Sequence, residues 1–66
     1  MRLTVNGRPS EVADGTDLRA LLTSLGLRVG SVVVEHNGRA LLRSELDGVD
    51  LADGDRLELV RAVAGG

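Results

Sequence analysis

The dipeptide Asn-Gly occurs twice in this chain, at 6–7 and at 37–38. Both residues tolerate a positive φ angle, which the tightest two-residue hairpin turns require. Each copy also follows a stretch of strand-forming residues. Pro9 has no N–H group to donate, so we expect the strand after the first turn to lie at a sheet edge. The sequence therefore predicts two β-hairpins, whose return strands cover roughly 8–13 and 39–42.

The apolar residues around these turns follow the two-residue period of a strand with one buried face. In the first and last predicted strands, apolar residues alternate with polar ones at Leu3, Val5, Leu57 and Leu59. Three consecutive valines at 32–34 are all β-branched, and the run is too short for a helix, so this segment is predicted to be a strand. We expect the last strand to end near Arg61.

One amphipathic helix is predicted between the hairpins. Thr16 is the expected N-cap, with Asp17 in the first turn, where a carboxylate favours the positive end of the helix dipole. Gly26 stands where a residue in the left-handed region commonly ends a helix. The core-facing stripe consists of four leucines at i, i+3, i+4 and i+7, namely Leu18, Leu21, Leu22 and Leu25.

The order of elements predicts the fold class. An irregular segment at 43–51, with a short helical turn around 44–46, leads to a turn at Asp53-Gly54 and then to the last strand. One helix covering one face of a mixed four- to five-stranded sheet gives the α+β class. The right-handed crossover rule places the last strand parallel to the first, which is the β-grasp or ubiquitin-like roll. We expect a single domain over 1–66, with 62–66 as a flexible tail.

Composition excludes several functional classes. The 66 residues contain no cysteine, which removes a disulfide framework, a thiolate metal site and a thiol nucleophile, and fits a reducing compartment. The absence of aromatic residues and a net charge of −2 argue against a nucleic-acid partner. No apolar stretch approaches the length of a membrane span or a signal peptide. We expect a cytoplasmic protein that is a monomer when free.

The residues that catalysis would use do not form a convincing set. His36 is the only histidine, and its place beside a hairpin turn predicts a solvated surface residue. Nothing in the sequence orients a triad from Ser44, His36 and Asp47. The spacing of four aspartates, Asp47, Asp50, Asp53 and Asp55, does not fit an EF-hand calcium loop, and turn chemistry accounts for Asp53-Gly54-Asp55. We therefore expect neither an enzyme nor a metal site.

The chain closes with Ala64-Gly65-Gly66. A glycine tail without side chains can thread a narrow channel and present the carboxylate of Gly66 to the active site of another protein. The chain has no ATP-binding motif and binds no cofactor of its own, so a partner must activate that carboxylate. The alternative interpretation is a frayed end without function.

A docking surface is predicted beside the tail. If Leu57 and Leu59 face the helix, Val60 is exposed on the other face, as is Val33, and the two lead toward Val63. Exposed apolar residues of this kind mark interaction sites, although scattered surface valines are an equal alternative. Arg61 is a candidate for pairing with acidic groups of a partner, and a solvated arginine is its alternative.

Over essentially its whole length the chain resembles the ThiS family of sulfur carrier proteins. The resemblance lies in the order of hairpin, leucine-striped helix and second hairpin, in the Asp53-Gly54-Asp55 turn, and in the Val63 to Gly66 ending. Two positions depart from the family pattern: Leu42 stands where many relatives have proline, and Leu46 where an aromatic residue is common. Both departures look like packing changes.

The resemblance implies a carrier that is a substrate of other enzymes. A ThiF-like adenylyltransferase would use ATP to adenylate the Gly66 carboxylate, and a cysteine desulfurase or another persulfide source would supply sulfur to form a thiocarboxylate. The thiazole synthase ThiG would receive that sulfur for the thiazole ring of thiamin, with Val63, Ala64, Gly65 and Gly66 entering the partner's active site. The alternatives are a MoaD-like small subunit of molybdopterin synthase and another prokaryotic ubiquitin-like sulfur carrier or protein modifier.

Overall fold

Five strands form one mixed sheet in residues 1–61, the part of the chain that the structure, a computed structural model, describes. The order across the sheet is β2-β1-β5-β3-β4. The central strand β5 (Arg56–Arg61) runs parallel to β1 (Arg2–Val5) and antiparallel to β3 (Val32–His36). The edge strands are β2 (Arg8–Glu11) and β4 (Arg39–Ala40). The predicted β-grasp arrangement is confirmed, including the parallel pairing of the last strand with the first.

Both Asn-Gly turns close hairpins as predicted. Asn6 and Asn37 each have a φ of 51°, and the glycine after each is also in the left-handed region. Pro9 lies on the edge strand β2, as its missing N–H group requires. The return strands are shorter than predicted, however, since β2 ends at Glu11 and β4 at Ala40.

The segment after β4 explains why that strand is so short. Leu42 is already the N-cap of the 3₁₀ helix η2 (Arg43–Gly48), whose Glu45 accepts a hydrogen bond from the Leu42 backbone N–H at 2.8 Å. This helix inserts Leu46 into the core, where the side chain is buried. The predicted helical turn around 44–46 is therefore confirmed and extends further than expected.

The helix α1 (Leu18–Ser24) begins one residue later than predicted, with Asp17 and not Thr16 as its N-cap. The Asp17 carboxylate accepts a hydrogen bond from the Ala20 N–H at 2.8 Å, whereas the Thr16 hydroxyl donates backward to the Ala13 carbonyl. Gly26 ends the helix as predicted, with a φ of 74°. Its N–H donates to the Thr23 carbonyl, and the next N–H reaches Leu22, which is a Schellman motif.

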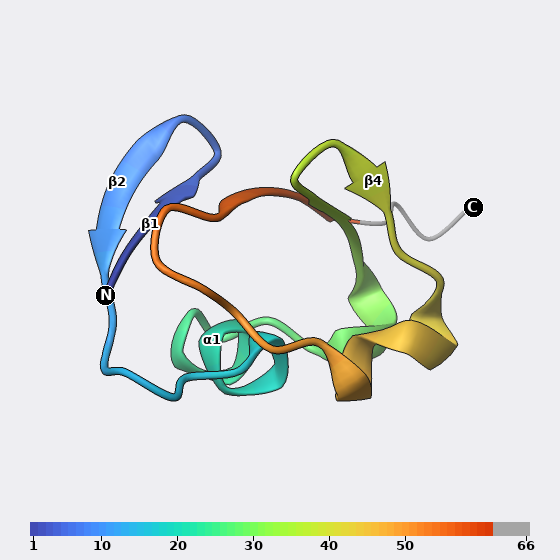
Figure 1. Cartoon of the computed structure of the whole chain (residues 1–66). Coiled ribbons are helices and arrows are strands. Elements are labelled where there is room, and N and C mark those ends of the chain that lie inside the picture. Colours follow the sequence, from blue (N-terminus) through green and yellow to red (C-terminus); the bar gives the residue numbers. More distant parts are fainter. Residues whose placement is uncertain (62–66) are drawn as a thin grey trace.

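The core of residues 1–61 lies between α1 and the sheet and consists of leucine and valine alone. Figure 1 shows α1 and η2 on the same side of the curved sheet. The prediction that Leu25 belongs to the core is wrong, because this side chain is 49% exposed. Leu25 is the C-cap of the short helix, and Leu27 packs against the core instead. The buried residues are Leu3, Leu18, Leu21, Leu22, Val32, Val34, Leu46, Leu57 and Leu59.

Within residues 1–61, no helix has the length and apolar character needed to cross a membrane.

Candidate functional site

The predicted site residues at the end of the chain, Val63, Ala64, Gly65 and Gly66, lie outside the described residues, as does the whole of the expected tail 62–66. The structure does describe β5, the strand that leads to them. This strand pairs with β1 on one side and β3 on the other, so its backbone is held from both directions. The candidate site is therefore the end of β5 and the surfaces beside it.

Val33 and Val60 lie directly opposite each other on β3 and β5. Their side chains are 50% and 61% exposed, as predicted. Because neighbouring residues on these strands point into the core, both valines face the side of the sheet away from α1. We call this side the open face and these two residues the valine pair. Their role in docking stays a prediction.

Arg61 is separated from the valine pair. It lies opposite Val32, a buried residue on the helix side of the sheet, and therefore belongs to the other face. There it lines a hollow of about 320 Å³ together with Leu25 and Leu27, which follow the end of α1. A partner that contacts all three predicted docking residues would have to reach around the end of β5.

Asn6 was predicted only as a turn residue, yet it also holds the end of β5. Its side-chain oxygen accepts a hydrogen bond from the Leu59 N–H at 2.7 Å, and its side-chain nitrogen donates to the Leu59 carbonyl at 3.2 Å. Its backbone N–H donates to the Leu57 carbonyl at 2.9 Å. The Asn6 amide thus extends the pairing of β1 with β5 by one step toward the tail.

Two glutamates also lie on the open face, next to the valine pair. Glu35 and Glu58 are directly opposite each other on β3 and β5, and both are exposed. They line a hollow of about 210 Å³ together with Gly38 and Arg56. Sequence reasoning missed this arrangement, because only the strand register brings the two carboxylates together.

The prediction that His36 is a solvated surface residue is wrong. Its side chain is 22% exposed, and its Nε2 atom lies 2.8 Å from Oδ2 of Asp55, which is 12% exposed. Asp47, the acidic residue of the triad considered from the sequence, pairs with Arg19 and not with His36. The structure therefore gives His36 a structural role, joining the second hairpin to the start of β5.

The Asp55 carboxylate is a hydrogen-bond acceptor for several groups where the second hairpin meets the start of β5. Its carboxylate accepts hydrogen bonds from the Ala52 N–H at 2.8 Å and from the Asn37 side chain at 3.1 Å, besides the contact with His36. Burial by itself raises the pKa of Asp55, but the hydrogen bonds from His36, Ala52 and Asn37 and the attraction of His36 outweigh it, so the pKa is lowered.

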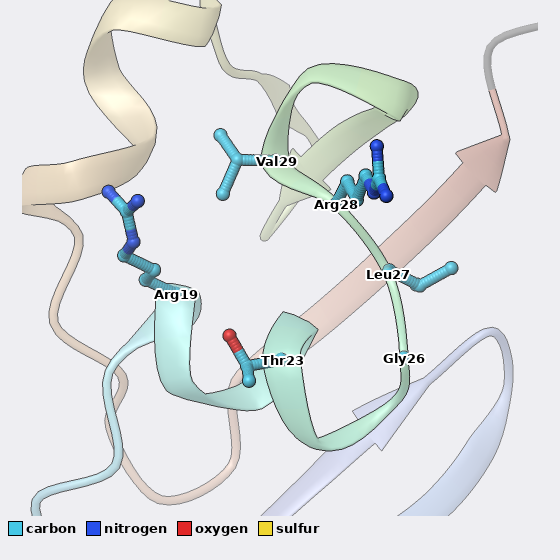
Figure 2. A pocket seen from close by; sticks show the side chains of 6 residues that line it. All are labelled: Arg19, Thr23, Gly26, Leu27, Arg28 and Val29. Atoms are coloured by element: carbon cyan, nitrogen blue, oxygen red, sulfur yellow. The ribbon is translucent and has the colours of Figure 1, made fainter.

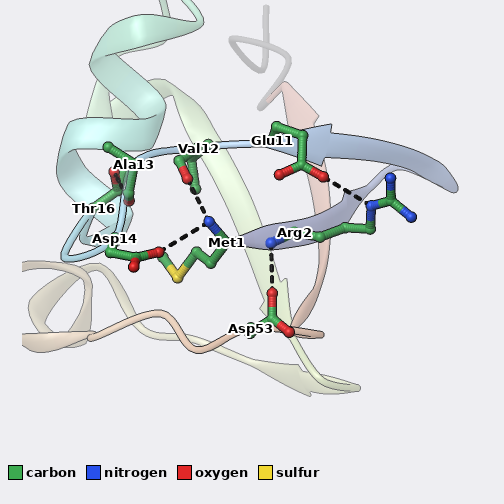
Figure 3. A network of polar contacts seen from close by, with 8 residues as sticks. All are labelled: Met1, Arg2, Glu11, Val12, Ala13, Asp14, Thr16 and Asp53. Carbon is green, nitrogen blue, oxygen red and sulfur yellow. Dashed lines mark hydrogen bonds and ion pairs between the residues drawn. The ribbon is translucent and has the colours of Figure 1, made fainter.

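Asp53 anchors the other side of the same turn to β1, as Figure 3 shows. Its carboxylate accepts a hydrogen bond from the Arg2 N–H at 2.6 Å, and the Gly54 N–H donates to the Arg2 carbonyl at 2.7 Å. The interpretation of Asp53-Gly54-Asp55 as turn chemistry fits these contacts. In the described residues, no group of three or more potential ligands is arranged to hold a metal ion.

A further hollow, of about 420 Å³, lies between α1 and the 3₁₀ helix η1 (Val29–Ser31). Figure 2 shows its two arginines, Arg19 and Arg28, on opposite sides and not directed at a common point. Arg19 extends toward η2, where it pairs with Asp47. This arrangement does not form a converging anion site.

Comparison with known proteins assigns the family. The model of the ThiS family matches residues 3–66, which include nearly the whole chain. The chain belongs to the ThiS family. The resemblance stated from the sequence is therefore confirmed.

Solved structures of ThiS proteins share the fold of this family member. The crystal structure of the thiamine biosynthesis protein (ThiS) of Geobacter metallireducens is 39% identical, with a TM-score of 0.84 and full coverage of both chains. A solution structure of a thiamine biosynthesis protein of the same organism is also 39% identical, with a TM-score of 0.81, and the match covers 100% of this chain and 88% of that one.

A curated relative extends the similarity to a longer protein. The thiazole synthase of Paramagnetospirillum magneticum is 35% identical over 66 residues, which is 100% of this chain. The chain spans only 20% of the length of that relative.

Proposed function

We propose that this ThiS family member is a sulfur carrier for the thiazole ring of thiamin. The observation that carries the proposal is the match to the ThiS family over residues 3–66. In this role the chain is a substrate of partner enzymes and not itself a catalyst. Its reactive group is the carboxylate of Gly66, and the partner that activates it is a ThiF-like adenylyltransferase.

The proposed chemistry begins with an unreactive carboxylate. A carboxylate oxygen of Gly66 attacks the α-phosphorus of ATP bound to the adenylyltransferase, and pyrophosphate leaves. A persulfide sulfur of a cysteine desulfurase then attacks the carbonyl carbon, and AMP leaves, which gives an acyl disulfide. A thiol then attacks the cysteine sulfur of the S–S bond, which forms a disulfide between the thiol and the desulfurase and releases the thiocarboxylate. These steps need no cysteine on the carrier, which agrees with the sequence.

The geometry of β5 supports this role. A carrier must hold the strand that leads to its tail at a constant position relative to the surface that a partner recognises. Pairing with β1 and β3, together with the Asn6 amide on Leu59, fixes the strand that leads to the tail. The valine pair lies on the same strand and its neighbour, and gives a partner an apolar surface close to that point.

The thiazole synthase ThiG is the proposed acceptor of the sulfur. A protein named thiazole synthase contains a region 35% identical to this chain, which supports a functional connection between the two. Val63, Ala64, Gly65 and Gly66 would enter the acceptor's active site, because such small residues pass a narrow channel without blocking it.

Mass spectrometry tests the proposal. The chain is incubated with ATP, a ThiF-like adenylyltransferase, a cysteine desulfurase with cysteine, and a thiol. We expect a mass gain equal to the replacement of one oxygen by sulfur, located at Gly66. An unchanged mass with several such adenylyltransferases would contradict the carrier role.

Two variants locate the reaction at the tail. Removing Gly66, or adding residues after it, is expected to abolish the mass gain, because the reacting carboxylate is displaced or replaced by an amide. A chain extended before Met1 is the control and should react normally. Circular dichroism should show the same fold for all three. Thiocarboxylate formation on the tail-extended chain without trimming would show that the carboxylate of Gly66 is not the acceptor.

A further inference from the structure

The glutamate pair, Glu35 and Glu58, is an unusual feature of the open face. Side chains directly opposite each other on antiparallel strands approach closely, and like charges in that position destabilise a sheet. Neither glutamate forms an ion pair with another residue in 1–61. Some other acids in this part of the chain do have cationic partners: the exposed Glu11 pairs with Arg2, and the partly buried Glu45 pairs with Arg39.

The surroundings of the glutamate pair leave space for a cation. The hollow of about 210 Å³ is lined by both glutamates, by Gly38, which has no side chain, and by Arg56. Within residues 1–61, Arg56 is the one cationic side chain that lines it; Arg56 lies two residues before Glu58 on β5, and its backbone is hydrogen-bonded to Asn37. Two carboxylates therefore face one guanidinium, and the hollow keeps a net negative charge.

The glutamate pair also continues the valine pair. Along β5 the outward residues are Arg56, Glu58 and Val60, and on β3 they are Val33 and Glu35. An apolar surface, the valine pair, and an acidic surface, the glutamate pair, are thus adjacent on two paired strands. A protein surface that fits both must present an arginine or lysine beside apolar side chains.

We propose that the glutamate pair receives a basic side chain of the adenylating enzyme, while the valine pair packs against apolar residues of the same enzyme. The inference rests on the proposed function, because that function supplies an enzyme that must bind the carrier before any bond forms. Binding places a positive charge between the carboxylates and relieves their repulsion. The glutamate pair thus lowers the stability of the free carrier and favours its complex with the adenylating enzyme.

The test compares Glu35→Gln, Glu58→Gln and the double variant with wild type. Removing the repulsion is expected to raise the urea midpoint of unfolding in all three. The KM for the carrier in ATP-dependent pyrophosphate release is expected to rise about tenfold in the double variant, with kcat unchanged, because the lost charge contact acts only in binding. Added salt should raise the wild-type KM more than that of the double variant.

Glu11→Gln is the matched control. It makes the same charge change on the same sheet, but on β2, two strands away from β5, and it removes an ion pair with Arg2 instead of a repulsion. It should leave KM unchanged and should not raise the urea midpoint.

The outcomes separate the inference from the proposed function. If wild type forms no thiocarboxylate with any adenylyltransferase, the proposed function fails. If wild type reacts and the double variant has the same KM, the inference alone is wrong. A loss of affinity only for the thiazole synthase would overturn the assignment to the adenylating enzyme. Binding of Ca²⁺ or Mg²⁺ by wild type, lost in the double variant, would show that the glutamate pair binds a metal ion and would overturn the assignment to a basic side chain.

Discussion

At the scale of single residues, Asp55 contributes more to the structure than its place in a turn suggests. Its carboxylate accepts hydrogen bonds from Ala52 and Asn37 and lies against His36, so that one side chain connects the turn before β5 to the second hairpin. Hydrogen bonds to an ionised group are stronger than those between neutral groups. The ionised form of Asp55 is therefore the form that the fold favours.

The pH dependence of stability should reveal this preference. The pKa of Asp55 in the folded chain is lowered from its ordinary value of 3.8, so its contribution is fully present above pH 3.8 and is lost as the pH falls through the lower, folded value. Asp55→Asn is expected to lower the free energy of unfolding by about 1.5–3 kcal/mol at pH 7. Urea unfolding of both proteins from pH 7 to 2 measures the difference, which should shrink in acid. A constant difference across this range would contradict the assignment.

At the scale of elements, Asn6 joins β1 to the far end of β5. Its positive φ closes the first hairpin, and its amide holds the Leu59 N–H and carbonyl. One residue thus serves a local turn and a contact between strands that are distant in the sequence. The corresponding residue of the second hairpin, Asn37, accepts a hydrogen bond from the Arg56 N–H at 2.8 Å, at the beginning of the same strand.

Replacing Asn6 with glycine separates the two roles. Glycine keeps the positive φ but removes both side-chain hydrogen bonds to Leu59. Asn6→Gly is expected to lower the free energy of unfolding by about 1–2 kcal/mol. Amide hydrogen exchange should become faster at Leu59. Asn37→Gly is the matched control, for which exchange should become faster at Arg56 and not at Leu59. Unchanged protection of Leu59 in Asn6→Gly would contradict the role given to the amide.

At the scale of the whole molecule, one face of β5 is buried in the core and the other is exposed. Leu57 and Leu59 belong to the core, whereas Glu58 and Val60 lie on the open face. In residues 1–61 the core contains only leucine and valine, and only five of its side chains are fully buried: Leu3, Leu18, Leu22, Leu57 and Val34. A domain of this size has little stability in reserve, so each of these side chains matters.

Two leucines, Leu22 within α1 and Leu25 at its C-cap, test which side chains belong to the core and which to the surface. Leu22 is completely buried, whereas Leu25 is 49% exposed. Leu22→Ala is expected to cost about 2–5 kcal/mol, enough to unfold much of the population at 37 °C, because it removes buried contacts and leaves a cavity. Leu25→Ala should cost about 1 kcal/mol or less. Thermal unfolding followed by circular dichroism measures both, and equal losses would contradict the corrected core.

Patterns between near neighbours in the sequence determined most of the fold. The Asn-Gly turns, the glycine that ends α1 and the alternation in β5 depend on local backbone conformation and side-chain period, so each could be predicted and each is confirmed. Where two local solutions compete, sequence reasoning was less exact: both Thr16 and Asp17 are good caps, and only the hydrogen bond to Ala20 decides between them. The resemblance to the ThiS family was also visible in the sequence.

The tertiary structure alone decided which distant residues meet. The Asn6 and Leu59 contact joins positions 53 residues apart, and His36 and Asp55 are 19 residues apart. Glu35 meets Glu58 only through the register of β3 with β5. No periodicity links such positions, because their approach depends on how the whole sheet packs on α1. For the same reason, the sequence predicted an exposed valine pair but not the two carboxylates beside it.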